Sequence, residues 1–327
     1  LESTLGTTAD EFYRETPYTY TLPDYLESSL TSSFMEYSIK RFDPITLFVA
    51  NGSNRIYDPL LELKNQFPDL RIVNQVYDHN VGWINRYDLD LLMAIDVHIA
   101  ANPNIEQAYI DQGVRPKDVY YIEHGIDPDE VDPEKYPQDL IKGLKGKIGL
   151  PLEKKIITFA ARMHPQKRPM DFVELARRFS TNSSVCFLMV GDGPLADQVD
   201  EQISKLGLDN MYRLNFYRPI SDIYALTDVL VLPSEYEAMP LVVAEAQAMG
   251  KPVVVTDVGN NREVVELTGG GVVVSRVGDV AGLMEGVRKM LVSPPDPAQI
   301  RKAILSRFGI QAISKLYGDV FLGSRNG

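Results

Sequence analysis

The feature that most constrains the fold is a regular alternation of short apolar runs and helical patterns over residues 155–274. The runs are rich in Val, Ile, Leu and Phe, and they predict strands at Lys155–Ala161, Val185–Val190, Tyr212–Phe216, Val229–Leu232, Pro252–Thr256 and Gly271–Val274. Strands that alternate with helices form right-handed βαβ units. The pattern therefore predicts a parallel sheet buried on both faces, as in a Rossmann-like domain.

The first part of the chain, residues 1–130, is also predicted to be α/β, with a less regular pattern. Buried strands are expected at Ile45–Ala50, Arg71–Val76, Val97–Ala101 and Val119–Ile122, and helices near Pro59–Gln66 and Ile105–Gln112. Residues 131–153 are rich in Pro, Gly and charge, which is typical of a connection between domains. We therefore expect an N-terminal domain over residues 1–130, a linker over 131–153 and a C-terminal domain over 154–307.

Length and composition support two globular domains. The chain has 327 residues, more than the roughly 250–300 at which a single hydrophobic core stops growing. Its 44% apolar and 24% charged residues exclude a disordered or fibrous protein. No apolar run approaches the roughly 20 residues of a membrane span, and the first residues show no secretion signal. With a single cysteine, Cys186, the expected location is the reducing cytoplasm.

Charge is distributed unevenly along the chain. Residues 1–130 carry 9 Lys and Arg against 22 Asp and Glu, a net charge of −13, whereas the remaining residues carry +1. An acidic first part argues against nucleic acid as a partner, because nucleic-acid binding requires Lys and Arg to replace phosphate counterions. An anionic ligand is expected on the second part. The alternative, that the acidic surface only favours solubility, remains open.

Polar residues follow several of the predicted strands. Arg162, His164 and Lys167 come after the first strand of the second domain, and a Gly191-Asp-Gly-Pro turn comes after the next. Ligands bind at the carboxyl ends of strands in open parallel sheets. Cations and helix N-termini that meet at one sheet edge are suited to phosphate, so we expect an anion site there.

Glu245 is the one charged residue in the otherwise apolar helical segment Pro240–Met249. A buried carboxylate needs partners, because leaving it unpaired costs several kcal/mol. A carboxylate accepts hydrogen bonds, and the two neighbouring hydroxyls of a ribose would supply the donors. A structural pair with an Arg or a backbone N–H is the alternative.

Five motifs together resemble family 4 retaining glycosyltransferases of the GT-B fold. The segment Glu237–Glu245 has a Glu-x7-Glu pattern, preceded by Val-Leu-Pro-Ser and followed by Ala-Met-Gly-Lys-Pro-Val-Val. The other four motifs are Arg162…Lys167, Gly191-Asp-Gly-Pro, Val258-Gly-Asn-Asn-Arg-Glu263 and His124-Gly-Ile-Asp127, which stand in the order and spacing of that family. The resemblance covers residues 119–327. It implies two Rossmann-like domains with a cleft between them, and a helix over 308–327 that crosses back to the first domain.

The resemblance also implies roles for individual residues. Arg162 and Lys167 would hold the diphosphate of a nucleotide sugar and stabilise its charge on departure. Glu237 would contact the transferred sugar and Glu245 the ribose. The remaining expected donor-binding residues are His164, Gly191, Gly193, Ala238, Met239, Pro240 and Leu241. His79 follows a predicted strand of the first domain, and it is either a residue of the reaction centre or a loop histidine without a partner.

The implied reaction is transfer of a sugar from a nucleotide diphosphate donor, a UDP- or GDP-sugar, with retention of anomeric configuration. The acceptor would be a glycan, a lipid-linked molecule or a protein, and no metal or other cofactor would be required. Residues 1–130 are fewer than a full first domain of this family, so we expect a shortened N-terminal domain or a piece of a longer polypeptide. The alternative function is a non-catalytic scaffold that binds nucleotide sugars.

Overall fold

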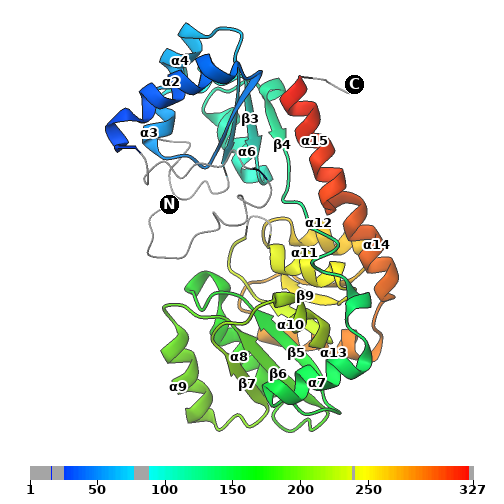
Figure 1. The fold of residues 1–327 in the computed structure, drawn as a ribbon. Coiled ribbons are helices and arrows are strands. Elements are labelled where there is room, and N and C mark those ends of the chain that lie inside the picture. The colour runs from blue at the N-terminus through cyan, green and yellow to red at the C-terminus, as the bar shows by residue number, and fades with distance from the viewer. Residues whose placement is uncertain (1–15, 17–25, 77–87, 238–239, 324–327) are drawn as a thin grey trace. The chain divides into compact units, whose positions relative to one another are not determined.

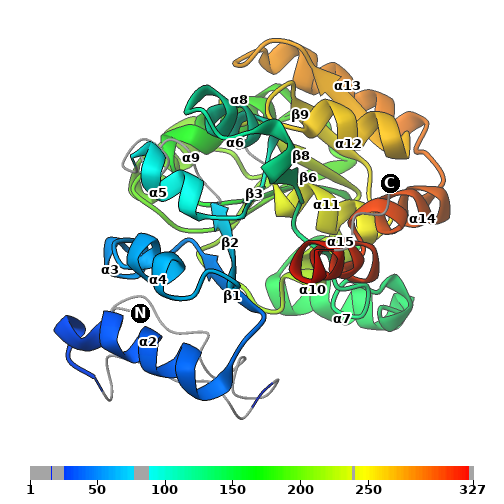
Figure 2. The same cartoon turned by 90° about the horizontal axis from the view of Figure 1, so that it is seen from above.

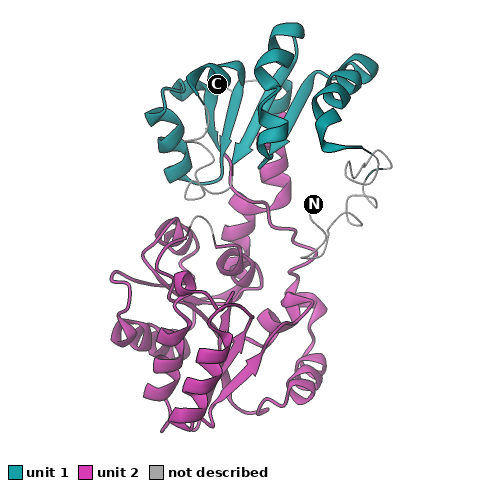
Figure 3. Ribbon diagram, turned by 90° about the vertical axis from the view of Figure 1, so that its left-hand side faces the viewer, with its two compact units in different colours: residues 1–121, 319–327 teal, residues 122–318 magenta. Residues whose placement is uncertain are grey.

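The computed structural model describes residues 16, 26–76, 88–237 and 240–323. They form two compact units: residues 1–121 with 319–327 are unit 1, and residues 122–318 are unit 2 (Figure 3). Each unit contains one parallel sheet, and we describe each by itself. Among the described residues, no helix combines the length and the apolar character needed to cross a membrane.

Unit 1 is built on a sheet of four described strands in the order β1-β2-β3-β4 (Figure 1). The strands are β1 (Thr46–Ala50), β2 (Arg71–Val76), β3 (Val97–Ala100) and β4 (Val119–Tyr121). The helices are α2 (Thr31–Phe42), α3 (Asn54–Tyr57), α4 (Leu60–Gln66), α5 (Leu89–Ala94) and α6 (Pro103–Asp111), with 3-10 turns at Ser28–Leu30 and Pro116–Asp118. Helices α3 and α4 lie beside β1 and β2 (Figures 1 and 2), and their residues Tyr57, Leu60 and Leu63 are buried in the core of the unit.

Local sequence explains where the helices of unit 1 begin. Helix α6 starts after Asn102, whose side chain accepts a hydrogen bond from the N–H of Ile105 at 3.0 Å, and Pro103 occupies its first turn. Helix α5 starts after Asp88, which caps Leu91 in the same way at 2.9 Å. Such caps satisfy N–H groups that have no partner within the helix. The Asp88 cap sets where the helix before β3 begins, and the Asn102 cap sets where the helix after β3 begins.

Unit 2 contains a six-stranded parallel sheet in the order β10-β9-β8-β5-β6-β7. The strands are β5 (Lys155–Ala160), β6 (Val185–Val190), β7 (Met211–Leu214), β8 (Val229–Leu232), β9 (Val253–Thr256) and β10 (Gly271–Val274). The helices are α7 (Gln138–Ile148), α8 (Pro169–Arg178), α9 (Ala196–Leu206), α10 (Ile220–Leu226), α11 (Leu241–Ala248), α12 (Asn261–Thr268), α13 (Val280–Val292), α14 (Pro297–Phe308) and α15 (Ile310–Leu322), with 3-10 turns at Pro133–Lys135 and Pro165–Lys167.

Both faces of the unit 2 sheet are covered by helices (Figure 1). Successive strand residues point to opposite faces. Ile156 and Leu230 therefore pack among residues of α7, α10, α11, α12 and α14, whereas Ile157 and Val231 pack among residues of α8, α9 and α13. Strands buried on both faces explain the continuous apolar runs in the sequence, and the predicted α/β architecture with parallel sheets is confirmed.

The structure differs from the sequence expectation at residues 131–153. This segment contains a 3-10 turn and helix α7, and it belongs to unit 2. Val131, Leu144 and Leu150 are buried in the same core as β5 and β6. The apolar side chains outweigh the low helix propensity of Gly143 and Gly146, because packing of an amphipathic face supplies most of the stability of a helix.

Within unit 2, the chain at Ile126 runs beside the junction between α14 and α15. The N–H of Ile126 donates to the carbonyl of Phe308 at 2.7 Å, and the N–H of Ile310 donates to the carbonyl of Ile126 at 2.8 Å. Gly309 separates α14 from α15 at this point. The expected single helix over 308–327 is therefore α15 alone, and its last residues are part of unit 1. There the carbonyl of Phe321 accepts a hydrogen bond from the Thr46 hydroxyl at 2.9 Å.

Candidate functional site

The strand order of unit 2 places a topological switch point at the carboxyl edge of the sheet. Strand β5 pairs with β6 on one side and with β8 on the other, so the direction in which the chain adds strands reverses beside β5. In open parallel sheets the ligand site lies at such a switch point, between the loops that follow the two strands. Here those loops are residues 161–168 after β5 and 233–240 after β8.

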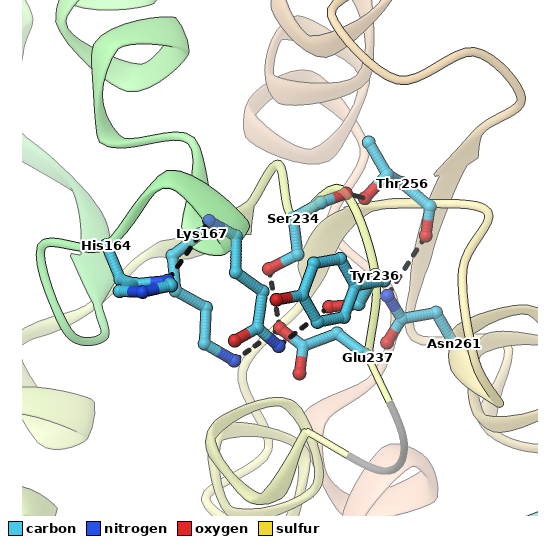
Figure 4. Close-up of polar contacts among 8 residues, drawn as sticks. His164, Lys167, Ser234, Tyr236, Glu237, Thr256 and Asn261 are labelled. Atoms are coloured by element: carbon cyan, nitrogen blue, oxygen red, sulfur yellow. Dashed lines mark hydrogen bonds and ion pairs between the residues drawn. The ribbon is translucent and has the colours of Figure 1, made fainter. Parts of the chain in front are cut away.

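Hydrogen bonds and an ion pair join these two loops (Figure 4). The side chain of Gln166 donates to the carbonyl of Tyr236 at 2.9 Å, and the carbonyl of Gln166 accepts from the N–H of Glu235 at 2.8 Å. The ammonium of Lys167 lies 2.5 Å from Oε1 of Glu237. Two of the residues that the sequence predicted for one site are therefore in direct contact.

The pair of Lys167 and Glu237 is largely shielded from water. The side chain of Lys167 is 15% exposed and that of Glu237 is 5% exposed. The hydroxyl of Ser234 donates a second hydrogen bond to Oε1 of Glu237 at 2.5 Å. Charge pairs are less screened when solvent is excluded, so the attraction within this pair is stronger than it would be at the surface.

Arg162 and His164 lie on the same loop as Lys167. Arg162 is exposed and makes no ion pair with any carboxylate of the described residues. Nδ1 of His164 accepts a hydrogen bond from the N–H of Gln166 at 3.3 Å, and the residue forms the N-cap of the 3-10 turn. The His164 ring thus shapes the loop, and the Arg162 guanidinium is left available for an anion.

The Gly191–Gly193 turn packs against the loop that carries Arg162. Gly191 has φ +138° and Gly193 has φ +150°. A Cβ at Gly191 would lie 1.9 Å from the carbonyl oxygen of Ala161, and one at Gly193 would lie 2.7 Å from that of Met163. The N–H of Met163 donates to the carbonyl of Asp192 at 2.9 Å. These glycines therefore allow two loops of the site to come into backbone contact.

Glu245 has a partner on the neighbouring helix. Its Oε2 accepts a hydrogen bond from the hydroxyl of Tyr224, on α10, at 2.6 Å. Burial raises the pKa of Glu245; the Tyr224 hydrogen bond lowers it, and the nearby carboxylate of Glu130 raises it further. The partner is thus a tyrosine hydroxyl rather than the Arg or backbone N–H considered from the sequence. Among the described residues, no donor bonds to the other oxygen, Oε1.

Helix α11 begins at the end of the loop that carries Glu237. Pro240 is its N-cap and provides no side-chain hydrogen bond to the first turn, and Leu241, its first residue, is 39% exposed. The first N–H groups of a helix have no partner within the helix, so they are suited to bind an anion or an oxygen-rich ligand. Three other expected site residues, His79, Ala238 and Met239, lie outside the described residues.

Three residues at the site were not found from the sequence: Ser234, Thr256 and Tyr224. Ser234 and Thr256 stand at the carboxyl ends of neighbouring strands, and the Thr256 hydroxyl donates to the carbonyl of Ser234 at 2.6 Å. Their positions after β8 and at the end of β9 were the available signal. Among the described residues, no group of three His, Cys, Asp or Glu side chains is arranged to hold a metal ion.

Comparison with solved structures identifies the class of fold. A glycosyltransferase from Rickettsia africae ESF-5 aligns with a TM-score of 0.80 and 17% identity, over 98% of this chain and 89% of that one. Anabaena Alr3699/HepE, solved in complex with UDP and glucose, aligns with a TM-score of 0.74 and 18% identity, over 90% of this chain and 82% of that one. The chain has the GT-B fold, with two Rossmann-like domains.

Sequence comparison identifies the family. The family model described as "Glycosyl transferases group 1" matches residues 141–307, about half of the chain. The chain belongs to this family. The motifs in the sequence predicted a GT-B glycosyltransferase, and the family membership confirms that prediction.

Two curated relatives match a similar part of the chain. One is the UDP-Gal:alpha-D-GlcNAc-diphosphoundecaprenol alpha-1,3-galactosyltransferase of Escherichia coli, 33% identical over 48% of this chain and 43% of the relative. Another is the N-acetyl-alpha-D-glucosaminyl L-malate synthase of Bacillus anthracis, 26% identical over 56% of this chain and 50% of the relative. The chain thus spans about half the length of these relatives.

Proposed function

We propose that unit 2 binds a nucleotide diphosphate sugar at the carboxyl edge of its sheet and that the protein transfers the sugar to an acceptor. The observation that carries this proposal is the largely shielded Lys167–Glu237 pair at the switch point, at 2.5 Å, on the same loops as the exposed Arg162. Such a site offers positive charge for a diphosphate and a carboxylate oxygen for sugar hydroxyls at one edge of the sheet. Membership of the glycosyl transferases group 1 family supports it.

Two cations would hold the diphosphate. Lys167 is held by its ion pair with Glu237, whereas Arg162 is exposed and without an ion-pair partner among the described residues, so Arg162 is available to close on a phosphate. As the bond between sugar and phosphate breaks, negative charge develops on the leaving diphosphate. Preorganised cations stabilise that charge more than they stabilise the bound donor, which is the condition for catalysis.

Glu245 would bind the ribose of the nucleotide. Tyr224 donates to its Oε2, which leaves Oε1 able to accept from a ribose hydroxyl. Its position in the second turn of α11, eight residues after Glu237, brings the nucleotide and the sugar to the same helix N-terminus. A carboxylate that accepts hydrogen bonds only is suited to a diol and not to a second phosphate.

We further propose that transfer retains anomeric configuration and needs no metal ion. The resemblance to family 4 enzymes supports retention by attack on the face from which the diphosphate leaves, and we assign no protein nucleophile. The Lys167 and Arg162 cations would stabilise the negative charge on the leaving diphosphate, as a divalent ion does in other enzymes. The acceptor class is a glycan, a lipid-linked molecule or a protein.

UDP-sugars are the first donors to test. The Escherichia coli relative is named for UDP-Gal, and the Anabaena structure contains UDP and glucose. GDP-sugars follow, because the residue roles proposed here concern phosphate, ribose and sugar and leave the base open. The alternative, a non-catalytic nucleotide-sugar scaffold or part of a larger enzyme, is kept because the chain spans about half of its curated relatives.

Thermal melting with UDP, GDP, ADP and their sugar conjugates tests donor binding. A ligand at about 100 times its Kd adds roughly 2.7 kcal/mol of stability, which shifts the midpoint visibly. The shift should disappear in Lys167→Ala and Glu245→Ala and persist in Lys155→Ala, whose ammonium pairs with Asp228 at the opposite edge of the sheet. The absence of any shift in the unaltered chain would contradict the proposal.

Sugar transfer separates the enzyme from the scaffold. With the nucleotide identified by melting, release of the free nucleotide diphosphate is measured with simple sugar and lipid-linked acceptors. Glu237→Gln should bind the free nucleotide diphosphate and lose most of the turnover. A protein that binds nucleotide sugars and releases no nucleotide with any acceptor would be a scaffold.

A further inference from the structure

Ser234 connects Glu237 to the neighbouring strand through both of its polar groups. The residue is fully buried, at 0% exposure, and it follows β8 directly after Pro233. Its hydroxyl donates to Oε1 of Glu237 at 2.5 Å, and its carbonyl accepts from the hydroxyl of Thr256, at the end of β9, at 2.6 Å. The carbonyl of Thr256 in turn accepts from the side chain of Asn261 at 3.0 Å (Figure 4).

The two donors to Glu237 meet at the same oxygen. Lys167 and Ser234 both bond to Oε1, each at 2.5 Å. Among the described residues, no hydrogen bond is made to Oε2. Oε1 is thus used to hold the carboxylate in place, and Oε2 is the oxygen left to accept from a ligand hydroxyl.

The two donors differ in what else they would bind. Lys167 would also bind the donor diphosphate, so part of its attraction to Glu237 is lost when the ligand arrives. Ser234 faces no such competition, because it is buried and its carbonyl is tied to Thr256. The short side chain of a serine also has fewer rotatable bonds than the side chain of a lysine, so it holds its position more rigidly.

We propose that Ser234 is the positioning residue of this site: it holds Glu237 against the transferred sugar while Lys167 binds the diphosphate. This inference rests on the proposed function and deepens it. Ser234 acts through Glu237 and touches no substrate. Thr256 supports Ser234 from the neighbouring strand, so the end of β9 contributes to the orientation of a carboxylate on the loop after β8.

Ser234→Ala is the direct test. A hydrogen bond to a charged group corresponds to about a 10- to 100-fold change in an equilibrium or rate. We expect kcat with the nucleotide sugar to fall by about that factor. The Kd for the free nucleotide diphosphate, which lacks the sugar, should remain within about twofold of the unaltered value, because Glu237 would contact the sugar alone.

Thr256 supplies a second pair of variants. Thr256→Val has nearly the same shape and removes the hydroxyl, so it should lower kcat by about three- to tenfold. Thr256→Ser keeps the hydroxyl and should restore the rate. Thr227→Val is the matched control, because the Thr227 hydroxyl is equally buried and bonds to Thr158 at 2.7 Å near the opposite edge of the sheet. It should lower the melting temperature and leave kcat unchanged.

The outcomes distinguish the inference from the function beneath it. If the unaltered chain transfers sugar and Ser234→Ala and Thr256→Val transfer it equally fast, the positioning role is refuted and the glycosyltransferase function stands. If either variant loses kcat and nucleotide-diphosphate affinity together, the residue is structural and the inference is again refuted. If the unaltered chain binds neither nucleotide nor nucleotide sugar, the proposed function and the inference both fail.

Discussion

His98 is expected to make unit 1 less stable as the pH falls, because its buried imidazole resists protonation in the folded state. The side chain lies in β3 at 0% exposure, and its Nε2 contacts the carbonyl of Leu92 at 3.0 Å. Burial lowers its pKa from 6.5 to about 4, although the hydrogen bond to Leu92 and the carboxylates of Asp118 and Asp96 act in the opposite direction. Among the described residues, Nδ1 has no hydrogen-bond partner.

The sign of the effect follows from proton binding by the two states. The unfolded chain binds a proton at His98 below about pH 6.5, whereas the folded chain does so only near pH 4. Stability is therefore fully present above pH 6.5 and is lost as pH falls from 6.5 to 4. The shift corresponds to about 3 kcal/mol in total, of which about 2 kcal/mol is lost by pH 5.

Urea unfolding of the unaltered chain and of His98→Gln, at pH 7.5 and at pH 5, measures this loss. Glutamine can keep a donor near the carbonyl of Leu92 and does not titrate, so the variant should lose about 2 kcal/mol less between the two pH values. Comparison of the two chains cancels the titration of the carboxylates. Equal losses in the two chains would refute the reasoning, because they would mean that His98 is protonated as easily in the folded chain as in the unfolded one.

Three further predictions concern the candidate site. Gly191→Ala should destabilise the protein by several kcal/mol in urea unfolding, because its Cβ would lie 1.9 Å from a carbonyl oxygen; Gly149→Ala, also at positive φ but with open space around it, should cost only about 1 kcal/mol. Tyr224→Phe removes the hydrogen bond that lowers the pKa of Glu245, so nucleotide affinity, measured by titration calorimetry from pH 8 to pH 5, should begin to fall at a higher pH than in the unaltered chain; identical pH profiles would contradict it. Glu237→Gln should reduce kcat by about 10- to 100-fold with nucleotide-diphosphate binding retained, since the charged acceptor for the sugar is lost; unchanged turnover in a nucleotide-release assay would exclude Glu237 from the reaction.

Strands β6 and β8 of unit 2 could be predicted closely because they are buried on both faces, whereas the edge strand β7 (Met211–Leu214) is half-buried and differs from the predicted Tyr212–Phe216. Val185–Val190, Val229–Leu232 and Gly271–Val274 match the predicted runs residue for residue. Periodicity carries no information on the order of strands in a sheet, and the contact between Lys167 and Glu237 depends on that order. Their meeting could be expected only from the resemblance and from the rule that ligands bind at strand ends.

Helices that depend on tertiary packing were harder to predict. The Pro, Gly and charge content of residues 131–153 predicts a linker where the structure has helix α7, and Gly143 and Gly146 each cost about 1 kcal/mol of helix propensity relative to Ala. Its Leu144 is nevertheless buried in the core with strands β5 and β6. Side-chain partners such as Ser234 and Tyr224 are beyond sequence patterns for a related reason: which hydroxyl reaches a carboxylate is decided by rotamers and by the distance between elements.

The Gly191–Gly193 turn has a structural role that the sequence pattern does not reveal. The sequence predicts Gly191 and Gly193 as donor-binding residues. In the structure, their missing side chains are already required by the loop after β5, whose carbonyls at Ala161 and Met163 lie where a Cβ would be. That contact fixes the backbone on both sides of Arg162, so the turn after β6 sets the position of a candidate catalytic cation whether or not a nucleotide touches it. A substitution at either glycine would therefore lower ligand affinity through Arg162 as well as stability. The two effects separate in Arg162→Ala, which removes the cation and leaves the backbone contact intact.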